Sequence, residues 1–259
     1  MSTVIKYTLN DAEELIRDIG GYDPITEAKD LLNKAESDEQ FSEYLDRRIN
    51  NHEPVAYITN HARFGGIDLY IDPRVLIPRS ETEALLQVAI DEVPHLGNVA
   101  DIGTGCGAIA LALKNERPDI NVVGLDISKD ALDVASINST ALGLEVEWRD
   151  ADLLEGVKED FGSVLANMPY LPTAKRDTYA PEMVDFEPQV ALWGGSDGYD
   201  LIRRLLAQAQ ARPVVKLVAL EIGLGQEDDV CELVRSTGFP TVFCTKDKRG
   251  DTRCVVGKR

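Results

Sequence analysis

The sequence predicts an α/β protein whose main domain is a doubly wound, mostly parallel sheet with helices on both faces. Three observations support this fold class. From residue 97 onward, strand-like and helix-like segments alternate, which is typical of parallel strands joined by helices. A glycine-rich stretch at 103–107 stands where the first of these strands gives way to a helix. Near the end, a short turn containing Gly250 joins two strands, so the final strand should be antiparallel.

Residues 1–52 are predicted to form a small helical domain. Asn10 or Asp11 is expected to cap the first helix, and Gly20-Gly21 to end it. Further helices are expected at 25–35 and 38–49. A core of this size gives little stability alone, so the domain should pack against the rest of the chain.

Residues 53–78 are predicted to form a β-hairpin that links this domain to the main one. Its strands are expected at 54–58 and 67–71, with Phe64-Gly65-Gly66 between them. A helix should then open within 77–83 and run to Val93. Ser80 and Glu83 have the spacing of a capping box.

Residues 79–259 are predicted to form the main α/β domain, with seven strands in its sheet. The strands are expected at 97–102, 121–126, 145–149, 162–167, 215–221, 240–245 and 252–256. The helices are expected at 106–115, 128–140, 198–211 and 226–237.

Size and charge limit the classes of function. The 259 residues suffice for one medium domain plus a small one, and a hydrophobic content of 44% is enough for a sizeable core. The formal net charge is −18, from 45 acidic and 27 basic residues. Nucleic-acid-binding proteins use Lys and Arg to neutralise phosphates, so this charge argues against a general nucleic-acid partner.

The cysteines and the N-terminal stretch bear on the cellular compartment. Four cysteines show neither metal-binding spacing nor the density of a disulfide framework, so we expect no metal and a reducing compartment. The stretch at 1–18 lacks the basic start and apolar run of a signal peptide. No apolar run approaches the ~18 residues of a membrane span. We therefore expect a soluble, cytoplasmic protein without membrane contact. Separately, we expect a monomer.

The first candidate site is the segment Asp101-Ile102-Gly103-Thr104-Gly105-Cys106-Gly107. Glycines at a strand-to-helix turn permit a tight bend and close approach of a ligand to the backbone, next to a helix N-terminus. A plain β-α turn would use the same residues, so this motif alone is a weak signal.

Two acidic positions after the following strands extend this site. Asp126 ends the next strand, about 20 residues beyond the loop, where an acid can accept hydrogen bonds from both ribose hydroxyls. Asp126 could also serve as the N-cap of the helix that starts near Ser128. Asp152 could meet an adenine amino group, and Leu153 could pack on the ring, although acidic loop residues are common.

The second motif is Asn167-Met168-Pro169-Tyr170, at the carboxyl end of the fourth strand. The Asn167 side-chain carbonyl and the Met168 backbone carbonyl can both accept hydrogen bonds from one NH2 group. Pro169 fixes the turn and has no N–H, and Tyr170 offers a flat face to a planar group. An ordinary strand exit would also fit these four residues.

Together the two motifs indicate S-adenosylmethionine-dependent methylation of a planar nitrogen, because both fall at strand ends on the same side of the sheet. The lone pair of an amide or aromatic amine is delocalised, and two fixed acceptors favour its localisation toward a methyl donor. The predicted catalytic residues are Asn167, Met168, Pro169 and Tyr170. The predicted cofactor-binding residues are Asp101, Gly103, Thr104, Gly105, Cys106, Gly107, Asp126, Ile127, Asp152, Leu153 and Asn167.

At this point the chain resembles the HemK-type protein-(glutamine-N5) methyltransferases, which modify peptide chain release factors. The resemblance covers roughly residues 53–259, and the helical N-terminus fits in kind. Beyond the two motifs, it is carried by Glu53-Pro54-Val55-Ala56-Tyr57-Ile58, Phe64-Gly65-Gly66, the segments 75–83 and 101–113, Phe186-Glu187-Pro188, Ala191-Leu192, Gly194-Gly195, Asp197-Gly198, and Leu220-Glu221-Ile222-Gly223 with Gln226.

This resemblance implies a Rossmann-like methyltransferase sheet and a release-factor substrate, methylated on the glutamine of its Gly-Gly-Gln loop. The cofactor would lie along the Gly103–Gly107 loop, on Asp126 and near Leu153, and the glutamine amide on residues 167–170. The helical domain would help hold the release factor.

Three departures from the family pattern stand out. Met168 replaces a proline, but the proposed contact is a backbone carbonyl, which Met also supplies. Ser80 replaces a proline at a helix start, and the N-terminal domain looks shorter than usual, which bears on docking more than on catalysis.

Two alternatives stay open. The same chemistry could act on a ribosomal-protein glutamine or on an amino group of a nucleic acid, although the net charge argues against nucleic acid. The chain could instead be a catalytically weak, cofactor-binding interaction module. An NAD-type oxidoreductase is disfavoured because the loop has the spacing Asp-x-Gly-x-Gly-x-Gly.

Overall fold

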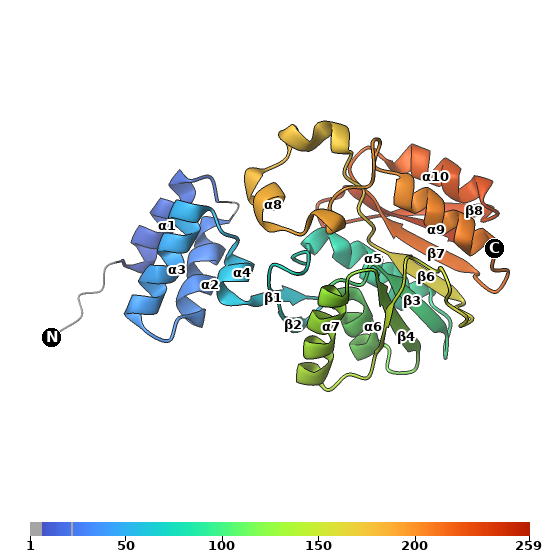
Figure 1. The fold of residues 1–259 in the computed structure, drawn as a ribbon, viewed down its shortest axis with the longest axis horizontal. Coiled ribbons are helices and arrows are strands. Elements are labelled where there is room, and N and C mark those ends of the chain that lie inside the picture. Colours follow the sequence, from blue (N-terminus) through green and yellow to red (C-terminus); the bar gives the residue numbers. More distant parts are fainter. Residues whose placement is uncertain (1–6, 22) are drawn as a thin grey trace.

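The computed structural model describes residues 7–21 and 23–259. Residues 1–6, which belong to the stretch interpreted as lacking a signal peptide, lie outside the described residues. Figure 1 shows a group of helices at the N-terminal end beside a larger unit of sheet and helices. Within the described residues, no helix is long and apolar enough to span a bilayer.

The main sheet has seven strands in the order β5-β4-β3-β6-β7-β9-β8. Their bounds are β3 Asn98–Ile102, β4 Asn121–Asp126, β5 Glu147–Asp150, β6 Ser163–Ala166, β7 Leu217–Glu221, β8 Thr241–Lys246 and β9 Thr252–Lys258. β9 pairs antiparallel with both β7 and β8, while the other pairs are parallel. The predicted seven strands and the antiparallel last strand are therefore confirmed.

The strand order places a switch point between β3 and β6. The chain runs from β3 outward to β4 and β5, then returns to β6 on the other side of β3 and continues toward the opposite edge. Ligands of open α/β sheets bind where the strand order reverses, outside the carboxyl ends of the strands. The carboxyl ends of β3 and β6 are thus the first place to look for a site.

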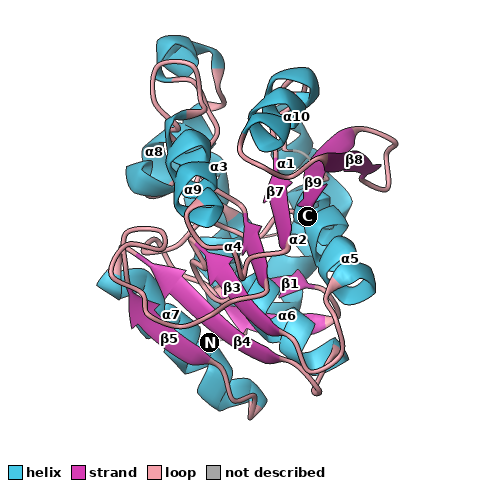
Figure 2. Ribbon diagram, turned by 90° about the vertical axis from the view of Figure 1, so that its right-hand side faces the viewer, coloured by secondary structure: helices cyan, strands magenta, loops and turns pink. Residues whose placement is uncertain are grey.

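Helices cover both faces of this sheet, as Figure 2 shows. One apolar core lies between the sheet and the helices α5 (Glu83–Glu92), α6 (Ala108–Glu116) and α7 (Lys129–Leu142). A second core lies on the opposite face, under α9 (Asp200–Gln210) and α10 (Glu227–Ser236). Within β3 the side chains alternate between these cores: Val99 enters the first, while Ala100 and Ile102 enter the second. The doubly wound architecture follows from this two-sided burial.

The N-terminal helices form where the sequence predicts them, with a different cap. They are α1 (Leu9–Asp18), α2 (Pro24–Lys34) and α3 (Asp38–Asn51). Thr8, not Asn10 or Asp11, caps α1: the Thr8 hydroxyl accepts from the Asp11 amide, and the Asp11 carboxylate accepts from the Thr8 amide. A reciprocal pair satisfies two amides that would otherwise lack partners, which explains the earlier start.

The prediction of a strand at 54–58 is wrong. Val55–Thr59 forms a short helix, α4, and the hairpin consists of β1 (His61–Phe64) and β2 (Ile67–Tyr70). The amides of Tyr57 and Ile58 donate to the Pro54 carbonyl at 3.0 and 3.1 Å, so the chain turns at the proline instead of extending. Ile58 is buried among the N-terminal helices, and the Tyr57 hydroxyl donates to the Val75 carbonyl at 2.7 Å.

The capping box predicted from Ser80 and Glu83 is also absent from the structure. Ser80–Thr82 forms a 3-10 turn, η1, before α5 begins at Glu83. The Ser80 hydroxyl bonds Glu81, and the Glu83 carboxylate pairs with Lys248. Each side chain thus finds a partner other than the helix start.

One segment between β6 and α9 was not predicted as regular structure. It contains η2 (Thr173–Thr178), α8 (Pro181–Phe186) and η3 (Gln189–Ala191). Figure 1 shows α8 between the N-terminal helices and the sheet unit. Arg48 of α3, which is buried, lies 2.7 Å from the Glu27 carboxylate and 3.2 Å from that of Glu182 on α8. This charged cluster joins the N-terminal helices to the segment between β6 and α9.

Candidate active site

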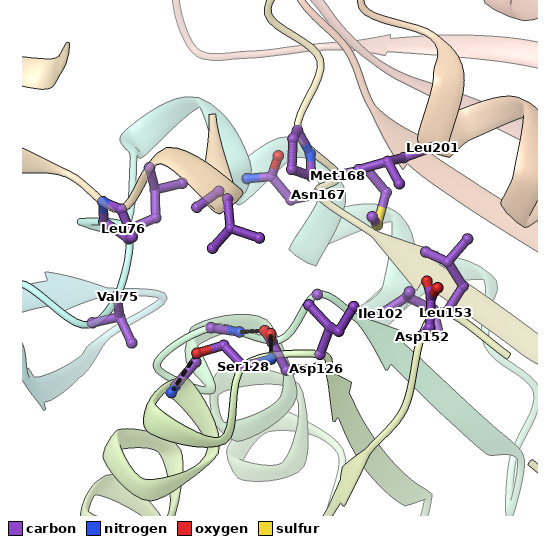
Figure 3. Close-up of a pocket in the computed structure, with 18 of the residues that line it drawn as sticks. Val75, Leu76, Ile102, Asp126, Ser128, Asp152, Leu153, Asn167, Met168 and Leu201 are labelled. Atoms are coloured by element: carbon purple, nitrogen blue, oxygen red, sulfur yellow. Dashed lines mark hydrogen bonds between the residues drawn. The ribbon is translucent and has the colours of Figure 1, made fainter. Parts of the chain in front are cut away.

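A cavity opens at the switch point between β3 and β6. Ile102 pairs with Ala166 across these strands, so Gly103 and Asn167 are the first residues beyond the paired ends. The cavity measures about 850 Å³ and is open to solvent. Figure 3 shows Asp126 and Ser128 on one side of it and Asn167 and Met168 on the other. The two motifs singled out from the sequence therefore face one space.

The glycine loop shapes one wall of this cavity. Gly103, Gly105 and Gly107 all have positive φ, of +67°, +57° and +83°. A Cβ on Gly105 would meet no atom within 4 Å, whereas one on Gly107 would lie 2.8 Å from the Trp148 ring. Gly105 thus leaves room beside the cavity, which it lines, and Gly107 lets the start of α6 approach the sheet.

Four residues of the predicted cofactor site do not line the cavity: Asp101, Thr104, Cys106 and Gly107. The Asp101 carboxylate accepts from the Thr104 hydroxyl at 2.6 Å and from the Ala110 amide at 3.2 Å. Burial raises the pKa of Asp101 to about 6. These bonds tie the loop to the first turn of α6. For these four residues, a direct role toward the cofactor stays a prediction.

Asp126 lies at the carboxyl end of β4, and its carboxylate faces the loop. Its Oδ2 accepts from the Gly105 amide and its Oδ1 from the Ser128 amide, both at 2.9 Å. Burial raises the pKa of Asp126, and the surrounding amides oppose that rise. The N-cap of α7 is Ser128, whose hydroxyl accepts from the Ala131 amide at 3.2 Å, so Asp126 does not cap that helix. Each Asp126 oxygen keeps a lone pair for a further donor.

Asp152 and Leu153 lie on the loop after β5, and both line the cavity. The Asp152 carboxylate pairs with Arg204 of α9 at 2.7 Å. Leu153 is buried and has a φ of +58°, a conformation that L-residues rarely adopt. Ile127, Ile102 and Leu201 add apolar surface to the lining.

These residues fit S-adenosylmethionine. A Cβ on Gly105 would meet no atom within 4 Å, so the space beside this backbone is open to a ligand. Asp126 offers two acceptors to a vicinal diol, and the apolar lining suits an adenine ring. Because S-adenosylmethionine carries no phosphate, no cationic cluster is needed at the loop.

A second cavity of about 400 Å³ adjoins the first at the Asn167 motif. Asn167, Met168 and Pro169 line both cavities, whereas Tyr170 lines only the second. The Tyr170 hydroxyl donates to Glu221 Oε1 at 3.2 Å, and the Tyr170 carbonyl accepts from Gln226 Nε2 at 3.0 Å. The motif is therefore a shared wall, and its tyrosine is held at both ends.

Three functional candidates were missed from the sequence: Thr82, Glu187 and Glu221. Thr82 accepts a hydrogen bond from Asn167 Nδ2 at 3.2 Å. Glu187 is buried, pairs with Arg79 and accepts from the Ile77 amide at 3.4 Å, which fixes the segment beside the second cavity. All three lie in segments that carry the family resemblance, which was the available signal, but their contacts join distant parts of the chain.

The Gly105→Ala variant is expected to bind S-adenosylmethionine about 10-fold more weakly, because the added methyl group projects into the open space beside a residue that lines the cavity. The backbone strain of an L-residue at positive φ adds a stability loss of roughly 1–2 kcal/mol. Isothermal titration calorimetry measures the affinity, and thermal unfolding measures the strain.

Gly143→Ala is the matched control. Gly143 ends α7 with a φ of +65°, has nothing within 4 Å of an added Cβ and lies away from the cavity. It should lose comparable stability and keep wild-type affinity. Equal affinity losses in both variants would mean that strain, not the filled space beside Gly105, explains the effect.

Comparisons with known proteins are consistent with this geometry. A family model described as "Methyltransferase small domain" matches residues 80–190. The release factor glutamine methyltransferase of Koribacter versatilis is 37% identical over 232 residues, which cover 87% of this chain and 81% of the relative. The protein of the same description from Geobacter sulfurreducens is 37% identical over 209 residues, covering 80% of this chain and 73% of the relative.

A solved structure supports the fold. A methyltransferase from Pyrococcus furiosus matches with a TM-score of 0.58 at 17% identity, covering 74% of this chain and 89% of that chain. At this identity the match concerns the arrangement of strands and helices alone.

Proposed function

We infer the activity from one premise: the chain belongs to the release factor glutamine methyltransferase family. It is an S-adenosylmethionine-dependent protein-glutamine methyltransferase, and its substrates are release factors. We propose that the target is the side-chain N5 of the glutamine in a Gly-Gly-Gln loop. The observation that carries this proposal is the shared wall of residues 167–169 between the two cavities.

With residues 167–169 between them, the first cavity would hold the cofactor and the second would hold the target amide. When bound, S-adenosylmethionine supplies a methyl group already activated by its sulfonium. Asn167 Oδ1 and the Met168 carbonyl would accept the two amide hydrogens of the target, and Tyr170 would cover its flat face. Fixed acceptors orient the nitrogen and favour its lone pair over the delocalised form, so positioning supplies most of the catalysis.

The predicted cofactor-binding residues would hold S-adenosylmethionine next to residues 167–169. Asp126 would accept from the ribose hydroxyls, while Gly103 and Gly105 leave space for the methionyl part. Asp152 and Leu153 would lie beside the adenine. For Asp152, the contact must compete with its ion pair to Arg204.

The N-terminal helices would contribute to docking. We propose the divisions predicted from the sequence: a substrate-docking domain at 1–52, a linker at 53–78 and the methyltransferase domain at 79–259. The contact of Arg48 with Glu182 supports a docking role, because it connects α3 to the segment that borders the second cavity. The enzyme would act in the cytoplasm as a monomer, with no nucleic-acid substrate.

The direct test is transfer of labelled methyl groups from S-adenosylmethionine to a release factor from the same source. We expect label on the intact factor and none on a copy whose Gly-Gly-Gln glutamine is changed to alanine. Ribosomal proteins and total RNA, offered in parallel, should stay unlabelled. Label on RNA in preference to the release factor would overturn the assignment. Equal label on both copies of the factor would mean that the methylated residue is not the Gly-Gly-Gln glutamine.

A further inference from the structure

The Asn167 side chain forms a hydrogen bond with Thr82, a residue outside its own motif. Its Nδ2 donates to the Thr82 hydroxyl at 3.2 Å, and Thr82 is 4% exposed. Thr82 ends η1 and directly precedes α5, 85 residues earlier in the chain. The amide of Asn167 therefore has one end fixed, and its Oδ1 is the end left for the cavities that Asn167 lines.

Thr82 in turn lies beside a buried carboxyl. Glu221 ends β7, is 2% exposed and lines the second cavity. Its Oε1 accepts from the Tyr170 hydroxyl at 3.2 Å, and its Oε2 has no close donor. Burial raises the pKa of Glu221 to about 7, hydrogen bonding from Thr82 and Tyr170 opposes the rise, and Arg253 and Glu81 are the charged neighbours.

Hydrogen-bond chemistry decides which of Asn167, Thr82 and Glu221 donates and which accepts. An ionised carboxylate can only accept, so the Tyr170 hydroxyl donates to Glu221, and the Thr82 hydroxyl must also donate whenever it turns toward this carboxylate. A threonine hydroxyl has a single proton, so once it points to Glu221 only lone pairs remain for Asn167. Asn167 can then meet Thr82 only through its NH2 end, because the opposite orientation would set two acceptors against each other.

We propose that Thr82 and Glu221 are positioning residues that fix the amide orientation of Asn167, so that the wall of the second cavity presents hydrogen-bond acceptors to its substrate. With Asn167 Oδ1 and the Met168 carbonyl, that wall selects a planar group bearing an NH2. The inference deepens the proposed function and rests on it for the identity of the substrate.

The test compares two substitutions of one residue, Thr82→Val and Thr82→Ser. Valine keeps the shape but removes the hydroxyl, whereas serine keeps the hydroxyl. At a pH well above the pKa of Glu221, we expect kcat on the release factor to fall about 10-fold in Thr82→Val, the loss typical of one hydrogen bond, and to stay within about 2-fold in Thr82→Ser. The Kd for S-adenosylmethionine, measured by calorimetry, should be unchanged in both.

A second readout does not depend on activity. The side-chain NH2 signal of Asn167, identified in a nitrogen-15 spectrum by its disappearance in Asn167→Asp, reports whether the amide is held. Its hydrogen exchange should be slow in the wild type and in Thr82→Ser, and faster in Thr82→Val. Glu221→Gln, which can donate as well as accept, serves as a second variant if Thr82→Val does not fold, and should likewise lower kcat and speed exchange.

The two readouts separate the two proposals. Wild-type protein that fails to methylate the release factor overturns the proposed function, and the exchange data then decide the orientation on their own. Equal kcat and equal exchange in the valine and serine variants would overturn the positioning role of Thr82.

Discussion

Replacing Asn167 with alanine should reduce turnover on the release factor by about 100-fold or more, because the variant loses the side-chain oxygen of Asn167. In the proposed mechanism, that oxygen accepts a hydrogen bond from the target amide, orients its nitrogen and stabilises the charge that develops there in the transition state. The side chain stands at the meeting of both cavities, and its amide is tied to Thr82. The neighbouring side chains of Met168 and Pro169 carry no oxygen that could replace the lost acceptor. Single-turnover transfer of labelled methyl groups measures the chemical step.

The cofactor affinity of this variant should stay within about 3-fold of wild type, since Asp126 and the glycine loop are untouched. Asn121→Ala is the matched control: Asn121 is exposed and begins β4, at the opposite end of the strand from the cavity. It should turn over normally. Wild-type turnover by Asn167→Ala would remove Asn167 from the mechanism and favour a different acceptor.

Much of the fold could be predicted because its signals are local. The strands of the main sheet are short apolar runs buried on both faces, as in β6, where every residue is buried. Periodicity and turn residues mark such elements without knowledge of their neighbours. The prediction of a strand at 54–58 was wrong because alternating burial of apolar residues in two different cores is also achieved by a short helix, which here begins at Val55.

The part of the candidate site that lies at strand ends could be predicted from the sequence. Gly103, Gly105, Asp126 and Asn167 meet because parallel strands bring their carboxyl ends to one edge. Thr82 and Glu221 could not be placed in this way. Their contacts with Asn167 and Tyr170 span 85 and 51 residues and depend on how η1 and β7 pack, which no local pattern encodes.

The second large effect concerns Asp126. The Asp126→Ala variant should bind S-adenosylmethionine about 100-fold more weakly, because it removes both carboxylate oxygens offered to the ribose hydroxyls and leaves the Gly105 and Ser128 amides without their acceptor. Hydrogen bonds to a charged group contribute about 1.5–3 kcal/mol each, and two of them account for a loss of this size. Calorimetric titration measures it, with Asp133→Ala, an exposed aspartate of α7, as the control that should bind normally.

The stability of the ligand-free Asp126→Ala protein should depend on pH differently from that of the wild type. Burial raises the pKa of Asp126, so the folded protein holds that proton more tightly than the unfolded chain does. For such a carboxyl, stability falls as the pH rises through the unfolded and then the folded pKa, and at neutral pH the ionised group is a net cost. The thermal midpoint of Asp126→Ala relative to wild type should therefore be higher at neutral pH than at acid pH, on top of a pH-independent loss from the two amides that lose their acceptor. A difference in midpoint that stays the same from acid to neutral pH would mean that Asp126 affects stability only through its hydrogen bonds to the Gly105 and Ser128 amides.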